Sequence, residues 1–383
     1  MPFARHDLEQ LEIQSLAPFA LKSGASKGRK HPESEPEYRT AFQRDRDRIL
    51  HSAAFRRLEY KTQVFVNDEG DYYRTRLTHT LEVAQIGRTL ARTLRANEDL
   101  VEAICLAHDL GHPPFGHAGE WALDELMSAH GGFNHNFQSY RVVTELEKRY
   151  ANWRGLNLTL ETLGGLAKHE TDFGLSEAVG LDPAQRGSLE AQIADITDAL
   201  AYTAHDLDDG LMAELLSPRE LEALDIWQMI CDKVGWRGGT LDEVTRHSLI
   251  RELVGMLVGD VLAVTDANLQ ALKPTKPEDI QNNTVNVVGY SDTMDTMRLE
   301  LRKVLYERMY SHYRVIRMQQ RARRFIREMF EALMEEPRQM TEDYEAHVNA
   351  RGLERTIADY IAGMTDRSAI QEYRQLFDPT VRP

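Results

Sequence analysis

The chain of 383 residues carries a formal net charge of −15, because 61 aspartates and glutamates outnumber 46 lysines and arginines. A chain of this length buries a core without disulfide bridges, and two cysteines are too few for an extracellular disulfide framework. The negative charge disfavours nucleic acid as the main substrate, and the lack of a long apolar run or a leader peptide predicts a cytoplasmic protein with no membrane partner.

The hydrophobic pattern predicts a mainly α fold. Residues 21–36 are rich in Ser, Gly, Pro and Lys without apolar periodicity, which predicts a partly mobile N-terminal arm over residues 1–36. Apolar residues then recur every three or four positions, as in residues 81–94 and 248–265, which predicts amphipathic helices. At most a few short strands are expected, at residues 62–66 and 284–290. We expect a helical core at 37–215 and a C-terminal helical region at 216–383 packed on it.

The segment AHDLGHPPFGHAGE at residues 107–120 holds three histidines. An apolar helix that begins at Leu100 leads into it, and Pro113 stops that helix. His108 and Asp109 therefore lie at a helix C-terminus, where the macrodipole favours a cation. A hydrogen-bonded core histidine beside a solvated aspartate would give the same dipeptide, so the dipeptide alone decides nothing.

A polar stripe follows on the helix predicted for residues 188–210. Side chains at three and four spacing share one face: Asp195, Asp198, Tyr202, Asp206 and Asp209. Like charges without lysine partners cost stability on a helix face. The stripe is either solvent cover or one wall of a cation site, and the residues leave both interpretations open.

Five segments in order resemble the HD-domain phosphohydrolases, and more narrowly their deoxyguanosinetriphosphate triphosphohydrolase-like branch. They are FRRLEYKTQVF (55–65), RTRLTHTLEVAQIGR (74–88), LAHDLGHPPFGHAGE (106–120), GGFNHNFQSYRVVTELE (131–147) and ADITDALAYTAHDLDDG (194–210). The resemblance covers residues 37–215 and implies an HD-domain helical core.

The resemblance implies a single divalent metal ion bound by His79, His108, Asp109 and Asp198, with Asp195 as the runner-up for the last position. Imidazole and carboxylate ligands together suit Mn, Mg or another first-row transition metal. The implied reaction is hydrolysis of deoxynucleoside triphosphates, dGTP or several dNTPs, to the deoxynucleoside and inorganic triphosphate.

The same resemblance assigns catalytic side chains. His117 is expected to be the general acid that protonates the leaving oxygen, and Glu120 its acidic partner. His112 and His135 are expected to contact phosphate or relay protons. Read without the resemblance, His112 and His117 would equally well cap a helix end.

Substrate contacts are expected from seven further residues: Gln63, Val64, Arg76, Tyr202, Asp206, Tyr313 and Arg314. Arg76 would offset phosphate charge, and Asp206 would accept from the 3′ hydroxyl that Gln63 also contacts. Val64 would collide with a ribose 2′ hydroxyl, which predicts a preference for deoxy substrates.

Two basic runs, at residues 44–48 and 317–327, are either solvated faces or phosphate sites at a subunit interface. The second interpretation adds a nucleotide effector or single-stranded nucleic acid as partners, and the resemblance implies a homo-oligomer, either tetramer or hexamer. The competing functions are another HD phosphohydrolase, such as a 5′-nucleotidase or an RNA or nucleotide phosphodiesterase, and a nucleic-acid-binding regulator with a vestigial metal site.

Overall fold

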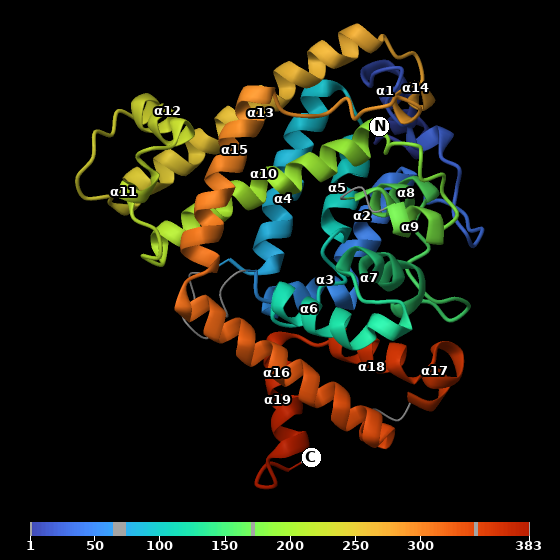
Figure 1. The fold of residues 1–383 in the computed structure, drawn as a ribbon. Helices are drawn as coiled ribbons and strands as arrows, with labels where there is room; N and C mark the ends of the chain where they lie inside the picture. Colours follow the sequence, from blue (N-terminus) through green and yellow to red (C-terminus); the bar gives the residue numbers. More distant parts are fainter. Residues whose placement is uncertain (1, 64–73, 170–172, 341–343, 383) are drawn as a thin grey trace. The chain divides into compact units, whose positions relative to one another are not determined.

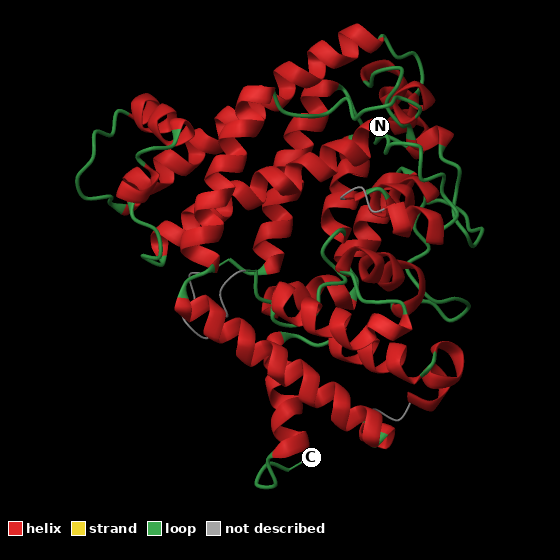
Figure 2. Ribbon diagram, in the orientation of Figure 1, coloured by secondary structure: helices red, strands yellow, loops and turns green. Residues whose placement is uncertain are grey.

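The computed structural model describes residues 2–63, 74–169, 173–340 and 344–382. Helices joined by loops make up this part of the chain, as Figure 2 shows. The only β pairing among the described residues is two isolated bridges, Arg29 with Thr159 and Thr62 with Thr75. The predicted mainly α fold is therefore confirmed.

The contacts divide the chain into two compact units, each built from separate stretches of sequence. The first unit is Met1–Leu50, His79–Ala107 and Leu156–His312, and the second is His51–Thr78, His108–Gly155 and Tyr313–Pro383. This division does not follow the predicted order of an arm, a core at 37–215 and a C-terminal region at 216–383. Those boundaries stay predictions.

The first unit centres on long helices (Figure 1). Helix α10 packs against α5, α8 and α13, and α2 packs along α5. Helix α4 starts in the second unit and continues into the first. The elements are α1 (Arg5–Ser15), η1 (Ser23–Ala25), α2 (Ala41–Leu50), α4 (Arg76–Leu94), α5 (Glu98–Ala107), α8 (Leu160–Ala167), α9 (Phe173–Ala178), α10 (Leu189–Met212), α11 (Pro218–Leu221), α12 (Asp225–Val234), α13 (Glu243–Leu272), α14 (Pro277–Gln281), α15 (Asp292–Leu305) and η7 (Tyr306–Tyr310).

Helix α10 is buried on more than its apolar side. It begins at the N-cap Ser188, whose side chain accepts a hydrogen bond from the Ala191 amide. Leu200 and Leu207 are buried as the periodicity predicts, but Asp206 and Asp209 on the acidic stripe are buried too. Solvent cover is therefore the wrong interpretation for these two carboxylates.

Residues 21–36 make specific contacts within the first unit, and the partial mobility of the N-terminal arm stays a prediction. The Lys27 amide donates to Glu161 Oε1 at 2.6 Å, and the Arg29 guanidinium is ion-paired with the buried Asp45. Composition alone missed these contacts because their partners lie elsewhere in the chain.

The strand predicted at residues 284–290 is wrong. The amides of Val287 and Val288, at 2.8 and 3.2 Å, donate to the Gln192 side chain instead of to a neighbouring strand. A strand needs a partner to satisfy its backbone, and here a side chain of α10 takes that role. The other predicted strand, residues 62–66, lies mostly outside the described residues.

The second unit is smaller and closes around its own apolar core. Helices α6, α16 and α18 contribute Leu123, Met127, Ile326, Met329 and Ile361 to this core. The elements are α3 (Ala53–Arg57), η2 (Leu58–Tyr60), α6 (Gly116–Met127), η4 (Ser128–His130), α7 (His135–Arg141), η5 (Val142–Leu146), α16 (Tyr313–Glu335), η8 (Pro337–Gln339), α17 (Tyr344–Arg351), α18 (Leu353–Ala362) and α19 (Asp366–Phe377).

Candidate active site

The turn that follows α5 carries His108 and Asp109 and packs closely on α7. A Cβ at Gly111 would lie 2.2 Å from the Ser139 amide nitrogen, so only glycine fits there. Ser139 Oγ accepts from the Gly111 amide at 2.8 Å and donates to the His108 carbonyl at 2.5 Å. Backbone contact and side-chain hydrogen bonds thus hold this turn in place.

Asp109 is buried among cationic and imidazole groups of the second unit. Its Oδ2 accepts from Arg76 at 2.8 Å, and its Oδ1 lies 3.5 Å from His108 Nε2 and 3.3 Å from His112 Nε2. Burial disfavours ionisation, but Arg76 and the two histidines outweigh it and hold the pKa of Asp109 well below its ordinary value. Arg76, predicted to contact phosphate, is ion-paired with a predicted metal ligand.

The four predicted catalytic side chains form one network, which we name the histidine cluster: His112, His117, Glu120 and His135. Glu120 joins two of the imidazoles, with His117 Nδ1 2.9 Å from Oε2 and His135 Nδ1 2.7 Å from Oε1. His112 stacks on His135 with ring centroids 3.9 Å apart. Burial alone would raise the pKa of Glu120, but the hydrogen bonds from His117 and His135 lower it far below its ordinary value. The turn into α6 sets this geometry, because Phe115 takes a left-handed φ of 65° just before the helix.

Two groups in the second unit have donor atoms spaced for a metal ion. They are Asp109 with His112 and His135, and His112 with His117 and Glu120, and within each group the ligand atoms lie within 4.8 Å of one another. The unit therefore contains His and acidic side chains that could hold a metal ion.

His79 and Asp198 meet in the first unit, across α4 and α10. His79 Nε2 lies 2.9 Å from Asp198 Oδ1, whereas Asp195 Oδ1 lies 3.9 Å from His169. The geometry favours Asp198 over the runner-up Asp195 as the partner of His79. The other ring nitrogen of His79, Nδ1, lies 3.4 Å from His205 Nδ1.

Sequence reasoning missed His205 and its partner Glu82. His205 Nε2 lies 3.0 Å from Glu82, so a carboxylate orients the ring that contacts His79. The available signal was spacing, because Glu82 comes one helical turn after His79.

Tyr202 and Asp206 of α10 meet a residue that the sequence did not single out, Tyr310. The Tyr310 hydroxyl donates to Asp206 and is also hydrogen-bonded to the Tyr202 hydroxyl. Burial and the charge of Asp206 raise the pKa of Tyr310 well above its ordinary value, which keeps the hydroxyl protonated. Tyr313 and Arg314, the predicted substrate contacts that follow Tyr310 closely in sequence, are exposed at the start of α16 in the second unit.

Gln63 and Arg76 both lie beside Gly116. A Cβ there would be 3.2 Å from the Arg76 guanidinium and 3.5 Å from the Gln63 carbonyl oxygen. The buried Gln63 Oε1 accepts no hydrogen bond from the described residues. Val64 lies outside the described residues.

The two basic runs have local partners. In residues 44–48, Arg44 and Arg48 are ion-paired with Glu33, and Arg46 lies 2.9 Å from Asp99. In residues 317–327, Arg323 stacks over the Trp121 ring at 4.9 Å and Arg327 lies 2.9 Å from Glu125. Much of the positive charge of the two runs is therefore paired with nearby carboxylates or an aromatic ring. A nucleotide effector and single-stranded nucleic acid stay predictions.

Comparisons with known proteins show the family of this chain. Residues 76–203 match the model of the HD domain, and residues 288–375 match that of the phosphohydrolase-associated domain. Deoxyguanosinetriphosphate triphosphohydrolase-like proteins align over nearly the whole chain: that of Geobacter sulfurreducens is 45% identical (98% of each chain), that of Bordetella pertussis 48% (96% of this chain, 97% of the relative) and that of Brucella ovis 45% (95% and 96%). The chain belongs to the deoxyguanosinetriphosphate triphosphohydrolase-like family.

Membership in the deoxyguanosinetriphosphate triphosphohydrolase-like family confirms the resemblance and makes the chain an HD-domain phosphohydrolase. The HD match includes every predicted metal ligand and the whole histidine cluster. In the described part of the chain, no helix is both long enough and apolar enough to span a membrane.

Proposed function

We propose that the protein hydrolyses deoxynucleoside triphosphates, dGTP or several dNTPs, to the deoxynucleoside and inorganic triphosphate. The observation that carries this proposal is the Glu120 carboxylate that joins His117 and His135. This carboxylate holds an imidazole in position to act as an acid, and relatives of this chain are named deoxyguanosinetriphosphate triphosphohydrolase-like proteins.

The proposed metal ligands are His79, His108, Asp109 and Asp198, and their donor chemistry fits a divalent ion. Neighbouring ligand atoms around an octahedral ion with bonds of about 2.1 Å are about 3 Å apart. The pair from the first unit, His79 Nε2 and Asp198 Oδ1, is 2.9 Å apart, and the pair from the second, His108 Nε2 and Asp109 Oδ1, is 3.5 Å apart. When bound, such an ion polarises a phosphoryl oxygen and lowers the pKa of water.

His117 is proposed as the general acid. An alkoxide leaves poorly unless it is protonated, so the 5′ oxygen needs a proton as its bond to phosphorus breaks. Glu120 accepts from His117 Nδ1 at 2.9 Å, which orients the ring and leaves Nε2 as the nitrogen that faces the substrate. The His117 side chain is 45% exposed, so a substrate can reach it.

The remaining contacts follow from placement and charge. Arg76 Nε makes no hydrogen bond among the described residues, so this arginine can bind phosphate while it pairs with Asp109. His112 and His135 would contact phosphate beside it. The other proposed substrate contacts are Tyr202 and Asp206 at the deoxyribose, Gln63 at the 3′ hydroxyl, Val64 as the gate against a 2′ hydroxyl, and Tyr313 and Arg314 at the phosphates or base.

The test is product identification. The purified protein is incubated with Mn or Mg and with each dNTP, singly and mixed, and the products are separated by ion-exchange chromatography. Inorganic triphosphate and deoxynucleoside support the proposal. Pyrophosphate or monophosphate would instead indicate another HD phosphohydrolase, and binding of nucleic acid with no product at all would indicate a regulator with a vestigial metal site. An equal rate on GTP and dGTP would remove the steric gate.

The choice of metal ligand is tested by a matched pair on α10. Asp198→Asn should lose both bound metal and turnover, because an amide is a poor ligand for a divalent ion. Asp195→Asn, three residues earlier on the same helix, should keep both. Metal content after dialysis, measured by elemental analysis, separates the two variants, and the reverse pattern would assign the ligand to Asp195. The proposed homo-oligomer, tetramer or hexamer, is checked by light scattering.

A further inference from the structure

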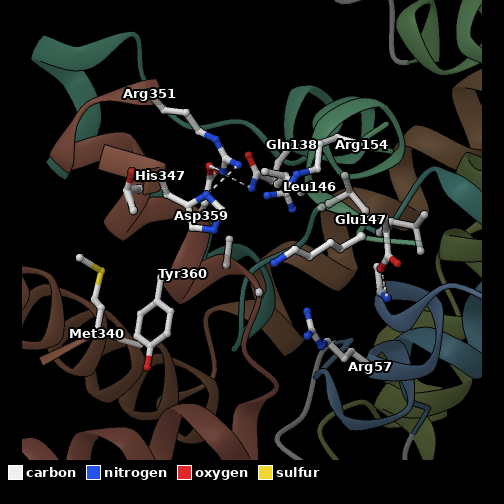
Figure 3. Close-up of a pocket in the computed structure, with 18 of the residues that line it drawn as sticks. Arg57, Gln138, Leu146, Glu147, Arg154, Met340, His347, Arg351, Asp359 and Tyr360 are labelled. Carbon is white, nitrogen blue, oxygen red and sulfur yellow. Dashed lines mark hydrogen bonds and ion pairs between the residues drawn. The ribbon is translucent and has the colours of Figure 1, made fainter. Parts of the chain in front are cut away.

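The second unit contains a cavity of about 320 Å³ that the proposed reaction does not use (Figure 3). None of the four side chains of the histidine cluster lines it. Its wall includes Leu110 and Gly111, which directly follow Asp109, and apolar side chains such as Val142 and Leu146. A cavity of this size is at the lower end of the range for small-molecule sites.

The charge of the lining is positive, although the whole chain is negative. Two carboxylates, Glu147 and Asp359, face four cationic side chains and the buried Lys61, and we name this cavity the cationic pocket. The four cations are Arg57, Lys148, Arg154 and Arg351. The whole chain has a net charge of −15, so four cations around one cavity are a local excess of positive charge.

Both carboxylates of the pocket are already engaged by other groups. Glu147 accepts from the amides of Ala53 and Ala54, at 3.3 and 2.7 Å, and so caps the start of α3. Asp359 is ion-paired with Arg141, which lies outside the lining, and with Arg351, and Figure 3 shows Asp359 and Arg351 joined by dashed lines. The acidic side chains therefore hold the walls together and do not neutralise the other lining cations.

Two arginines of the pocket keep their donors available. Neither Arg57 nor Arg154 forms an ion pair or a side-chain hydrogen bond with the residues that the structure describes, and both are exposed. Lys61, by contrast, is buried and donates to the carbonyls of His112 and Ala362. Guanidinium groups bind phosphate oxygens in pairs of parallel hydrogen bonds, so two such groups in a concave site fit a ligand with several phosphate oxygens.

We propose that the cationic pocket binds a multivalent phosphate compound. Inorganic triphosphate and nucleoside phosphates share the recognised chemistry, and the apolar part of the wall leaves room for a base or sugar. This site does not depend on the proposed reaction, because its residues are neither the proposed metal ligands nor the proposed acid.

Calorimetric titration of the full chain tests this proposal. The protein is kept in EDTA so that no reaction proceeds, and inorganic triphosphate, dGTP, orthophosphate and citrate are titrated in turn. Triphosphate or dGTP should bind, and both should bind more tightly than orthophosphate or citrate. Equal affinity for triphosphate and dGTP assigns recognition to the phosphates alone, whereas tighter binding of dGTP adds the nucleoside. Citrate binding as tightly as triphosphate overturns the proposal, as does no binding of either phosphate ligand.

A pair of double variants with the same change in charge locates the site. Arg57→Ala with Arg154→Ala should weaken triphosphate binding by at least about tenfold, because each loses charge-assisted hydrogen bonds. Arg56→Ala with Arg149→Ala removes two exposed arginines next in sequence to pocket residues but outside the lining, and should change affinity by about twofold or less. Equal weakening in both double variants would indicate binding by general charge and would overturn the proposal.

Discussion

The histidine cluster and the cationic pocket adjoin in the second unit, where Leu110 and Gly111 of the pocket directly precede His112 of the cluster, but they differ in how their charges are satisfied. In the cluster, Glu120 is hydrogen-bonded to two imidazoles, and beside it Asp109 is ion-paired with Arg76. In the pocket, Arg57 and Arg154 have no such partner among the described residues. A network in which the charged groups are hydrogen-bonded to one another holds its side chains in one geometry, whereas arginines without a protein partner favour binding of an anionic ligand. The two regions therefore suit different tasks.

The largest effect should come from Asp109, one of the proposed metal ligands. Asp109→Asn is expected to lower dNTP turnover by at least about 10³-fold, more than the 10–100-fold typical of residues that only support a metal ligand. Initial rates with Mn or Mg measure the loss. Triphosphate binding to the cationic pocket should persist in this variant, since Asp109 does not line it. Thermal unfolding checks that the fold survives, and turnover near the wild-type rate would exclude Asp109 as a ligand.

A smaller loss is expected at the proposed acid. His117→Ala should reduce turnover by about 10²- to 10⁴-fold, because positioned proton transfer contributes this much. Metal content should stay at the wild-type level. Added imidazole should restore part of the rate by supplying the missing proton donor, while Glu120→Gln, which leaves His117 in place, should gain nothing from it. A His117→Ala enzyme that works at nearly the normal rate would clear this residue of the acid role.

Gly111 lines the cationic pocket and directly precedes His112 of the histidine cluster, so a substitution there should lower the stability of the fold. Gly111→Ala is expected to lower the free energy of unfolding by about 3 kcal/mol, since its Cβ would clash with the backbone of α7. Urea denaturation followed by circular dichroism measures the change. The matched control is Gly164→Ala in α8, where a Cβ meets no atom within 4 Å and the better helix former should leave stability equal or slightly higher. Similar losses at both positions would contradict the close packing of the Gly111 turn.

The smallest effect concerns the charge of Lys61. Burial, with the nearby charge of Arg57, lowers its pKa to about 7, against an ordinary value of 10.5 in the unfolded chain. Between these pH values the unfolded state binds more protons, so the free energy of unfolding should rise with pH, by up to about 1.4 kcal/mol per pH unit. The slope should be absent in Lys61→Met. Urea denaturation of both proteins from about pH 7 to pH 9 compares the slopes. Parallel pH dependence would show that Lys61 does not titrate in this range.

Several parts of the site could be predicted because their signals are local. The helices containing residues 81–94 and 248–265 follow from a repeat of three to four residues, and the structure has them within α4 and α13. The motif at residues 107–120 has His117 and Glu120 three residues apart, and in the structure the two side chains meet in the first turns of α6. Local order was enough here because the interacting groups are near neighbours in the chain.

Other parts depend on partners that are distant in sequence. Asp198 and Asp195 were equivalent on the predicted helix, and only the packing of α4 against its surroundings puts His79 2.9 Å from Asp198. Tyr310 reaches Asp206 across 104 residues, so no pattern near either residue indicates the pair.

From its own pattern, the amino-acid sequence determined the helical fold, the order of the histidine and aspartate motifs and the family. Tertiary structure alone decided which side chain each buried carboxylate contacts, and that Arg57, Arg154 and Arg351 surround a single cavity. The physical reason is the separation along the chain over which each interaction acts. Helix periodicity and capping act between residues a few positions apart, whereas burial and charge pairing act between any groups that folding brings together.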